Sequence, residues 1–218
     1  MKFKKIKIIS EFAHFKIPYG SKIQSTYEIP PISTVIGIVK NLFYDRNYNL
    51  QNVVFGYTFE YKKKTYDIQK IYKDINLTEK ALRERYNSDG YWISDVCKIE
   101  YLYKPILTIY IDIDKKFTIK EPLNLGKTDC LAKIVEIKDI EIEEKRSVAT
   151  NQYTSINIGE GVIKRIACDT LYNLNKGIYD INTLLVRENS IFNSKWTISD
   201  ENKGVFLWQK KEGSLYEF

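Results

Sequence analysis

The chain has 218 residues, of which 44% are hydrophobic and 28% charged, and its net charge is +6. This composition excludes a mainly disordered chain and favours one globular domain or two small ones. The mild positive charge is compatible with a phosphate-binding surface and equally with an ordinary lysine-rich surface. Three cysteines without a CxxC pair, and a single histidine, argue against a zinc site, so we expect no metal and no cofactor.

Residues 1–8 alternate lysines with apolar residues and lack the apolar core of a signal peptide. No later stretch is long enough to span a membrane. We therefore expect a cytoplasmic protein with reduced thiols and no membrane partner.

The N-terminal part predicts a strand, a long loop and a helix. Apolar residues alternate with lysines over residues 2–10, which is typical of a strand. An extended loop over residues 11–31 follows, and apolar positions at three- and four-residue steps then predict a short helix over residues 33–44. Gly37 costs this helix about 1 kcal/mol relative to alanine, so we expect another backbone or a ligand to approach it closely.

Further along the chain, strands dominate the prediction. Apolar and β-branched residues predict strands at 52–60, 65–73, 96–114 and 133–143. Pro105 is expected to break the third of these strands or to place it at an edge, and residues 77–88 predict a second short helix. The element order indicates an α+β fold, with a ferredoxin-like (RRM-like) domain over residues 1–145. Residues 146–218 are expected to form a small β-rich C-terminal domain.

Two glycine-containing motifs are incomplete as nucleotide sites. Gly126-Lys127-Thr128 ends like a P-loop, but Glu121 stands where the first glycine of that motif belongs. Gly159-Glu160-Gly161 lacks the third glycine of a dinucleotide-binding turn, because Lys164 occupies its place. We therefore reject a nucleoside triphosphatase and do not favour a dinucleotide-binding enzyme.

His14 is the single histidine of the chain, and it has two interpretations. It is either a structural side chain or the general base of a metal-free ribonuclease, which would activate a 2′-hydroxyl with help from Lys16 or Tyr19. Carboxylates do not cluster as metal ligands do, since Asp112 and Asp114 lie on one face of a predicted strand end. A metal-independent endoribonuclease that processes repeat RNA is therefore the alternative to a binding protein.

Cations and aromatic residues interleave in two segments. The loop before the first predicted helix contains Lys16, Tyr19, Lys22 and Tyr27. The segment between two predicted strands contains Lys80, Arg83, Arg85, Tyr86, Tyr91 and Trp92. Such groups bind phosphates through their cations and stack bases on their rings, although charged helices are also often simply solvated. RNA is the ligand class that this pattern favours.

Two segments together resemble a known family. The first runs from Phe15 to Phe43, with Thr26-Tyr27 before Pro30-Pro31 and then Ser33-Thr34-Val35-Ile36-Gly37-Ile38-Val39. The second is Leu125-Gly126-Lys127-Thr128-Asp129-Cys130-Leu131, which is similar to a Leu-Gly-Arg-x-x-Cys loop. In this order they resemble the Cas-five family of CRISPR-associated proteins, the member of the repeat-associated RNA-binding superfamily that binds the 5′ handle. The match spans roughly the N-terminal two-thirds of the chain.

The resemblance implies a non-catalytic subunit of a type I CRISPR Cascade surveillance complex, which serves antiviral defence. Its expected partners are the 5′ handle of the crRNA, which it caps, and the backbone and large subunits of Cascade. A thumb inserted at about residues 74–95 would contact the backbone subunit, and the chain length is similar to that of subtype I-B members. By motif, the RNA would be lined by Ser25, Thr26, Tyr27, Pro31, Ser33, Gly37, Gly126, Lys127, Thr128 and Cys130.

The chain departs from the family pattern in two places. Residues 115–124 are too few for the second helix of a ferredoxin-like domain, and Pro122 interrupts them. The adjacent Lys-His pair of the branch that cleaves RNA is missing, which favours the branch that only binds it. A protein-interaction module without RNA contact stays open as a third interpretation.

Overall fold

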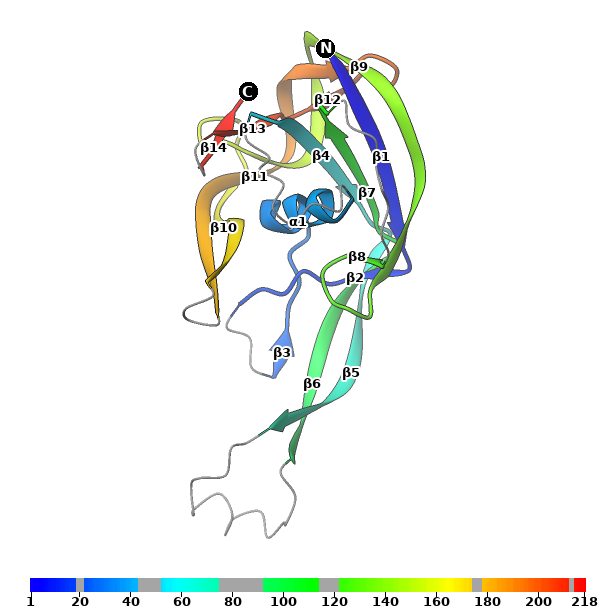
Figure 1. Ribbon diagram of the computed structural model, residues 1–218, viewed down its shortest axis with the longest axis vertical. Helices are drawn as coiled ribbons and strands as arrows, with labels where there is room; N and C mark the ends of the chain where they lie inside the picture. The colour runs from blue at the N-terminus through cyan, green and yellow to red at the C-terminus, as the bar shows by residue number, and fades with distance from the viewer. Residues whose placement is uncertain (19–21, 43–51, 75–91, 114–121, 174–177, 212–213) are drawn as a thin grey trace.

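A computed structural model describes the chain at residues 1–18, 22–42, 52–74, 92–113, 122–173, 178–211 and 214–218. One helix, α1 (Ile32–Leu42), lies beside a large sheet in this part of the chain (Figure 1). In spatial order, the sheet contains β10 (Val162–Asn173), β11 (Ile178–Ile198), β9 (Leu131–Thr154), β1 (Lys2–Ser10), β7 (Ile106–Ile111), β4 (Val54–Glu60), β13 (Trp208–Lys211) and β14 (Ser214–Glu217). In addition, β12 (Lys203–Val205) pairs with β11, and β8 (Leu123–Asn124) pairs with β9.

A second, smaller sheet forms around a long hairpin. The hairpin strands are β5 (Lys63–Asp74) and β6 (Trp92–Tyr103), and β6 also pairs with the short strands β2 (Phe12–Ala13) and β3 (Ile23–Gln24). The hairpin projects away from the body of the molecule (Figure 1). The chain leaves β6 at Lys104 and Pro105 and enters β7, so the interruption predicted at Pro105 is observed.

The predicted fold class, a ferredoxin-like α+β fold, is wrong. Of the described residues, 68% are in strands and 7% in helix, and α1 is the single helix among them. The main reason is the length of β9 and β11, which run for 24 and 21 residues. These strands extend the antiparallel sheet, and the described part of the chain packs one helix on it where a ferredoxin-like fold requires two. The helix predicted at 77–88 lies outside the described residues.

Strand β9 connects the two halves of the chain. Its first part, Ala132–Glu141, pairs with β1, and its second part, Ile142–Thr154, pairs with β11. The sheet is thus continuous across residue 145, where the sequence predicted a domain boundary. The division at that residue stays a prediction, whereas the pairing that crosses it is a feature of the structure.

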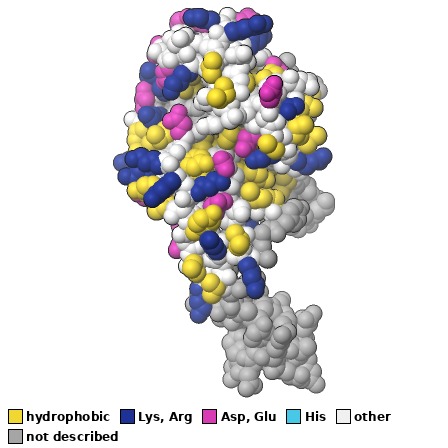
Figure 2. All heavy atoms as spheres, turned by 180° about the vertical axis from the view of Figure 1, so that it is seen from behind, with side chains coloured by type: hydrophobic (Ala, Val, Ile, Leu, Met, Phe, Trp, Pro, Cys, Tyr) yellow, Lys and Arg dark blue, Asp and Glu magenta, His cyan; other side chains and the backbone are white. Residues whose placement is uncertain are grey.

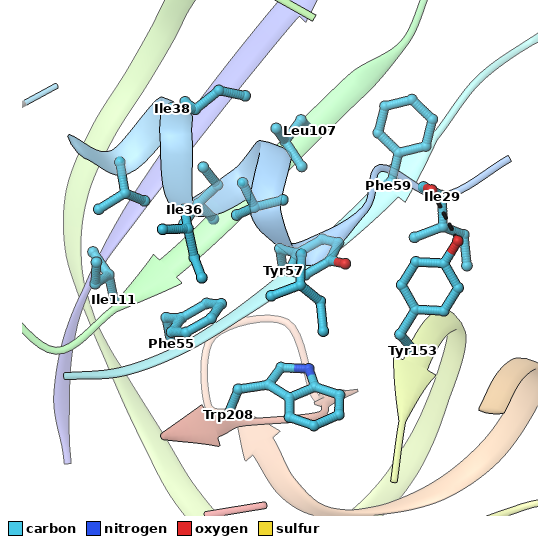
Figure 3. Close-up of a cluster of buried hydrophobic side chains, with 14 of the residues drawn as sticks. Ile29, Ile36, Ile38, Phe55, Tyr57, Phe59, Leu107, Ile111, Tyr153 and Trp208 are labelled. Carbon is cyan, nitrogen blue, oxygen red and sulfur yellow. Dashed lines mark hydrogen bonds between the residues drawn. The ribbon is translucent and has the colours of Figure 1, made fainter. Parts of the chain in front are cut away.

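The helix packs one face on the sheet and so forms the main core. Its apolar residues at helical spacing are buried, and Figure 3 shows Ile36 among side chains from β4 and β7. Two buried tyrosines fix the segment before the helix: the Tyr57 hydroxyl donates to the Pro30 carbonyl at 2.8 Å, and the Tyr153 hydroxyl donates to the Ile29 carbonyl at 3.0 Å (Figure 3). The start of α1 is therefore held in place by both halves of the chain.

Helix α1 has 11 residues. Within the described ranges, no helix combines the length and the hydropathy needed to cross a bilayer.

Candidate nucleic-acid interface

Gly126 lies where the turn after β8 meets the segment that follows β2. The His14 amide donates a hydrogen bond to the Leu125 carbonyl at 3.1 Å, and His14 forms a parallel β-bridge with Gly126. Gly126 has a φ of +90°, and a Cβ atom added to it would lie 2.0 Å from the His14 carbonyl oxygen. Glycine is therefore required here for both its backbone conformation and the close contact. The Leu125 amide closes the turn by donating to the Cys130 carbonyl at 2.9 Å.

The segment between β2 and α1 folds back on itself, and Thr26 holds the two arms together. The Tyr27 amide donates to the Phe15 carbonyl at 2.9 Å, and the Phe15 amide donates to the Thr26 hydroxyl at 2.8 Å. The Thr26 amide in turn donates to the Glu100 carboxylate of β6 at 3.0 Å. Thr26 is buried, so its role in the structure is to attach the loop to the hairpin.

A cleft of about 1160 Å³ opens between these segments. Its walls come from residues 14–18, from residues 24–34 at the start of α1, from the turn at 126–127 and from the β10–β11 hairpin. The predicted site residues that line it are His14, Lys16, Tyr27, Pro31, Ser33, Gly126 and Lys127. Folding thus brings the two sequence segments that carry the family resemblance to one surface.

The cleft is positively charged. Lys16, Lys127 and Arg165 line it, and its described lining residues include no aspartate or glutamate. Large clefts elsewhere on the described surface are lined in part by carboxylates. The first turn of α1 adds the positive end of a helix dipole. A polyanion is therefore favoured at this cleft over the other hollows of the described surface.

Lys127 belongs to a fixed polar network at the base of the hairpin. Its ammonium donates to the Gln69 amide oxygen at 2.6 Å, to the Asp129 carboxylate at 2.8 Å and to the Tyr101 hydroxyl at 3.1 Å. Burial lowers the pKa of Lys127, but the hydrogen bonds to Asp129 and Tyr101 more than offset this and leave the pKa raised. The charge is therefore permanent and held in one position, and the Asp129 carboxylate offsets part of its field at the cleft.

His14 is buried and neutral. Its Nδ1 lies 2.7 Å from the Glu100 carbonyl oxygen, which can only accept, so Nδ1 carries the proton. Nε2 is then an unprotonated acceptor, and it is buried without a hydrogen-bond partner among the described residues. Burial lowers the pKa of His14 below its usual value. The ring contacts Tyr101 at a centroid distance of 5.7 Å, so the side chain packs as part of the junction between loop and hairpin.

Other predicted site residues lie away from the cleft walls. These are Lys22, Ser25, Thr26, Gly37, Thr128 and Cys130. Burial raises the pKa of the Cys130 thiol to about 12, so this cysteine is an inert core residue. Apart from the backbone of its own helix and its two chain neighbours, no described atom lies within 4 Å of a Cβ added to Gly37, so the expected close approach of another backbone is not seen among the described residues. Tyr19, Arg83 and Arg85 lie outside the described residues.

One wall of the cleft was not predicted from the sequence. Arg165 and Ala167 of β10, and Ile181 and Thr183 of β11, face it. Arg165 and its neighbours alternate as a strand does, but only the pairing of β11 with β9 places this hairpin beside α1. Gln24 of β3 also lines the cleft; it lies inside the Phe15–Phe43 segment but was not among the predicted site residues.

Comparisons with known proteins identify the fold. No family model matches the sequence, and no curated protein shows significant sequence similarity to it. The structure aligns with a chain of a solved structure described as a CRISPR RNA-guided surveillance complex, with a TM-score of 0.53 and 10% identity, over 88% of this chain and 91% of that chain. It also aligns with a CRISPR protein from Archaeoglobus fulgidus over 99% of this chain and 98% of that one, at 9% identity and a TM-score of 0.42. The first alignment shows that the chain shares its fold with a chain of that surveillance complex.

Proposed function

We propose that this protein is a non-catalytic, RNA-binding subunit of a type I CRISPR surveillance complex, in which it caps the 5′ handle of the crRNA. The observation that carries the proposal is the cationic, carboxylate-free cleft at which the two predicted RNA-lining segments meet. The fold shared with a chain of a surveillance complex supports the same assignment. Assembly with the crRNA and other subunits in the cytoplasm belongs to this proposal.

The cleft suits a single strand of RNA. Tyr27 is half-buried and Pro18 is exposed, so these two residues offer the ring face and apolar surface against which unpaired bases pack, whereas Phe15 and Pro31 are buried. The hydroxyls of Ser33 and Thr34 offer hydrogen bonds to base edges, sugars or phosphates. Lys16 is exposed at the rim, where its ammonium can follow a phosphate. Shape, stacking and charge together favour an unpaired handle over a duplex.

The projecting hairpin is the surface proposed for the backbone subunit. Tyr66, Ile68 and Val96 are 54%, 72% and 60% exposed, and the pairing register places them on one face of β5 and β6. Lys98 lies over the Tyr66 ring at 4.0 Å, and Figure 2 shows hydrophobic side chains next to lysines along the described part of the hairpin. Apolar side chains in such a position favour contact with another protein.

A metal-independent endoribonuclease is the second candidate, and the bare Nε2 of His14 is the observation that favours it. A general base must reach the proton that it removes, whereas His14 is 3% exposed. Access to Nε2 would therefore require the loop to open. The binding function needs no such movement, and for this reason we favour it.

The experiment is a titration of labelled repeat RNA with the purified protein in EDTA, with each sample run on native and denaturing gels. Capping predicts a shifted and intact RNA, with weaker binding when the handle sequence is scrambled. A discrete cut within the repeat that is lost in His14→Gln, while RNA binding is retained, would instead establish the nuclease. Equal affinity for handle and scrambled RNA would contradict the capping function.

A further inference from the structure

The β10–β11 hairpin forms a wall of the RNA cleft, although it belongs to the part of the chain without family resemblance. Arg165 and Thr183 line the cleft from this side, and the Arg165 guanidinium donates to the Thr183 hydroxyl at 3.4 Å. Ile181 lines the same wall and is 59% exposed. A basic and apolar wall of this kind has the composition of a nucleotide-binding surface.

The two arginines of the hairpin differ in how their donors are used. The Arg187 guanidinium donates to the Ile156 carbonyl at 2.8 and 3.0 Å and to the Gly161 carbonyl at 2.9 Å, so it holds the turn after β9. Arg165 is exposed, has one long hydrogen bond, and has no carboxylate within ion-pair distance in the described part of the chain. Since a guanidinium has five donors, most of those of Arg165 are available to a ligand.

The charge of the cleft favours phosphate as the ligand of Arg165. The cleft wall around it contains no described carboxylate, and the other described cations of the cleft, Lys16 and Lys127, come from the N-terminal half and the turn after β8. A guanidinium fork matches two oxygens of one phosphate. The apolar side chain of Ile181 beside it suits the sugar or base of the same nucleotide.

We propose that the β10–β11 hairpin is part of the RNA site, with Arg165 binding a backbone phosphate of the strand that occupies the cleft. This inference rests on the proposed function. Under this proposal, both halves of the chain bind the same RNA strand. Because the contact is to a backbone phosphate, the β10–β11 hairpin contributes affinity that does not depend on the RNA sequence.

The first test compares Arg165→Gln with Arg146→Gln. Arg146 is an exposed arginine of β9 that lines no described cleft. Arg146→Gln therefore removes the same charge from the protein at a position outside the cleft. For a single strand, one phosphate contact contributes about 0.7 to the slope of log affinity against log salt concentration. The affinity supplied by that contact therefore rises about fivefold when the salt falls from about 1 M to about 0.1 M. Arg165→Gln should therefore weaken binding of labelled handle RNA about fivefold at low salt and reduce the slope by about 0.7. Arg146→Gln should match the wild type.

The second test places a carboxylate on the same strand at two positions. Ile181→Glu introduces it into the cleft, whereas Ile191→Glu introduces it at a site that is 69% exposed and outside the cleft. We expect Ile181→Glu to weaken binding by about tenfold at low salt, through lost apolar contact and repulsion of phosphate, and Ile191→Glu to have little effect. Thermal unfolding of all four variants checks that each is folded.

The outcomes separate the two proposals. If the wild type binds handle RNA but each cleft variant equals its control, the role of the hairpin is refuted and the proposed function stands. If the wild type does not prefer handle RNA over scrambled RNA, the proposed function falls and this inference falls with it. Weaker binding by Arg165→Gln with an unchanged salt slope would also overturn the phosphate assignment, because the contact would then be to a base.

Discussion

Replacing Gly126 by alanine tests the junction that builds the cleft. At a φ of +90° an alanine is strained, which costs about 1–2 kcal/mol. The added Cβ atom would also lie 2.0 Å from the His14 carbonyl oxygen, so the two segments must separate. Separation weakens the 3.1 Å hydrogen bond from the His14 amide to the Leu125 carbonyl, worth about 1 kcal/mol. We expect Gly126→Ala to lower the free energy of unfolding by about 2–4 kcal/mol.

Gly37→Ala is the matched control, because the same substitution should act in the opposite direction. Gly37 is inside α1, and no described atom beyond its own helix backbone and chain neighbours lies within 4 Å of its added Cβ. Its replacement should raise stability by about 1 kcal/mol through helix propensity. Urea unfolding followed by tryptophan fluorescence measures both variants. A Gly126→Ala protein as stable as the wild type, or a destabilised Gly37→Ala, would refute this account of the two glycines.

Three further predictions concern single side chains. Because burial lowers the pKa of His14 in the folded protein, the unfolded chain takes up this proton at a higher pH, so stability should fall as the pH drops below about 6.5. His14→Gln should make the urea midpoint depend less on pH between about pH 7 and about pH 5.5. A pH dependence equal to that of the wild type would contradict the assignment. Asn189→Ala should cost about 2–3 kcal/mol, since this buried amide bonds the Gly161 amide, the Thr154 hydroxyl and the Ile158 carbonyl, and hydrogen exchange at Gly161 should accelerate. The Cys130 thiol, with a pKa of about 12, should resist iodoacetamide in the folded protein at about pH 8, and rapid alkylation seen by mass spectrometry would show that it is accessible.

Local patterns predicted much of the secondary structure. The alternation over residues 2–10 corresponds to β1, and the helical spacing over residues 33–44 corresponds to α1. The break at Pro105 separates β6 from β7 as expected. These features depend on neighbours in sequence, and for this reason the residues themselves carry the signal.

The fold class could not be predicted in the same way. The alternation over residues 133–143 indicated a strand, but the residues do not show that β9 continues to Thr154 and changes its partner from β1 to β11. Pairing between segments distant in sequence decides whether a strand ends under a helix or extends a sheet. The order of the predicted elements indicated an α+β class, and the family resemblance implied the same fold, but the completed sheet contradicts it.

The candidate site was predicted in part for the same physical reason. The motifs around Tyr27 and Gly126 identified two walls of the cleft. They could not show that Thr26 is buried and serves the loop, because its burial depends on a hydrogen bond to Glu100 of a distant strand. Arg165 was missed because its place in the cleft follows from long-range strand pairing and has no local motif.

The central claim is that RNA binds in the cleft, and a charge-reversal pair tests it most directly. Lys16 and Lys22 are both exposed residues of the segment between β2 and α1, but only Lys16 lines the cleft. The measurement is the affinity of each variant for labelled handle RNA by fluorescence anisotropy at about 0.1 M salt. The account predicts that Lys16→Glu loses about tenfold or more in affinity, from one lost phosphate contact and added repulsion, while Lys22→Glu binds nearly as the wild type does. Equal affinities for the two variants, or a larger loss in Lys22→Glu, would contradict it.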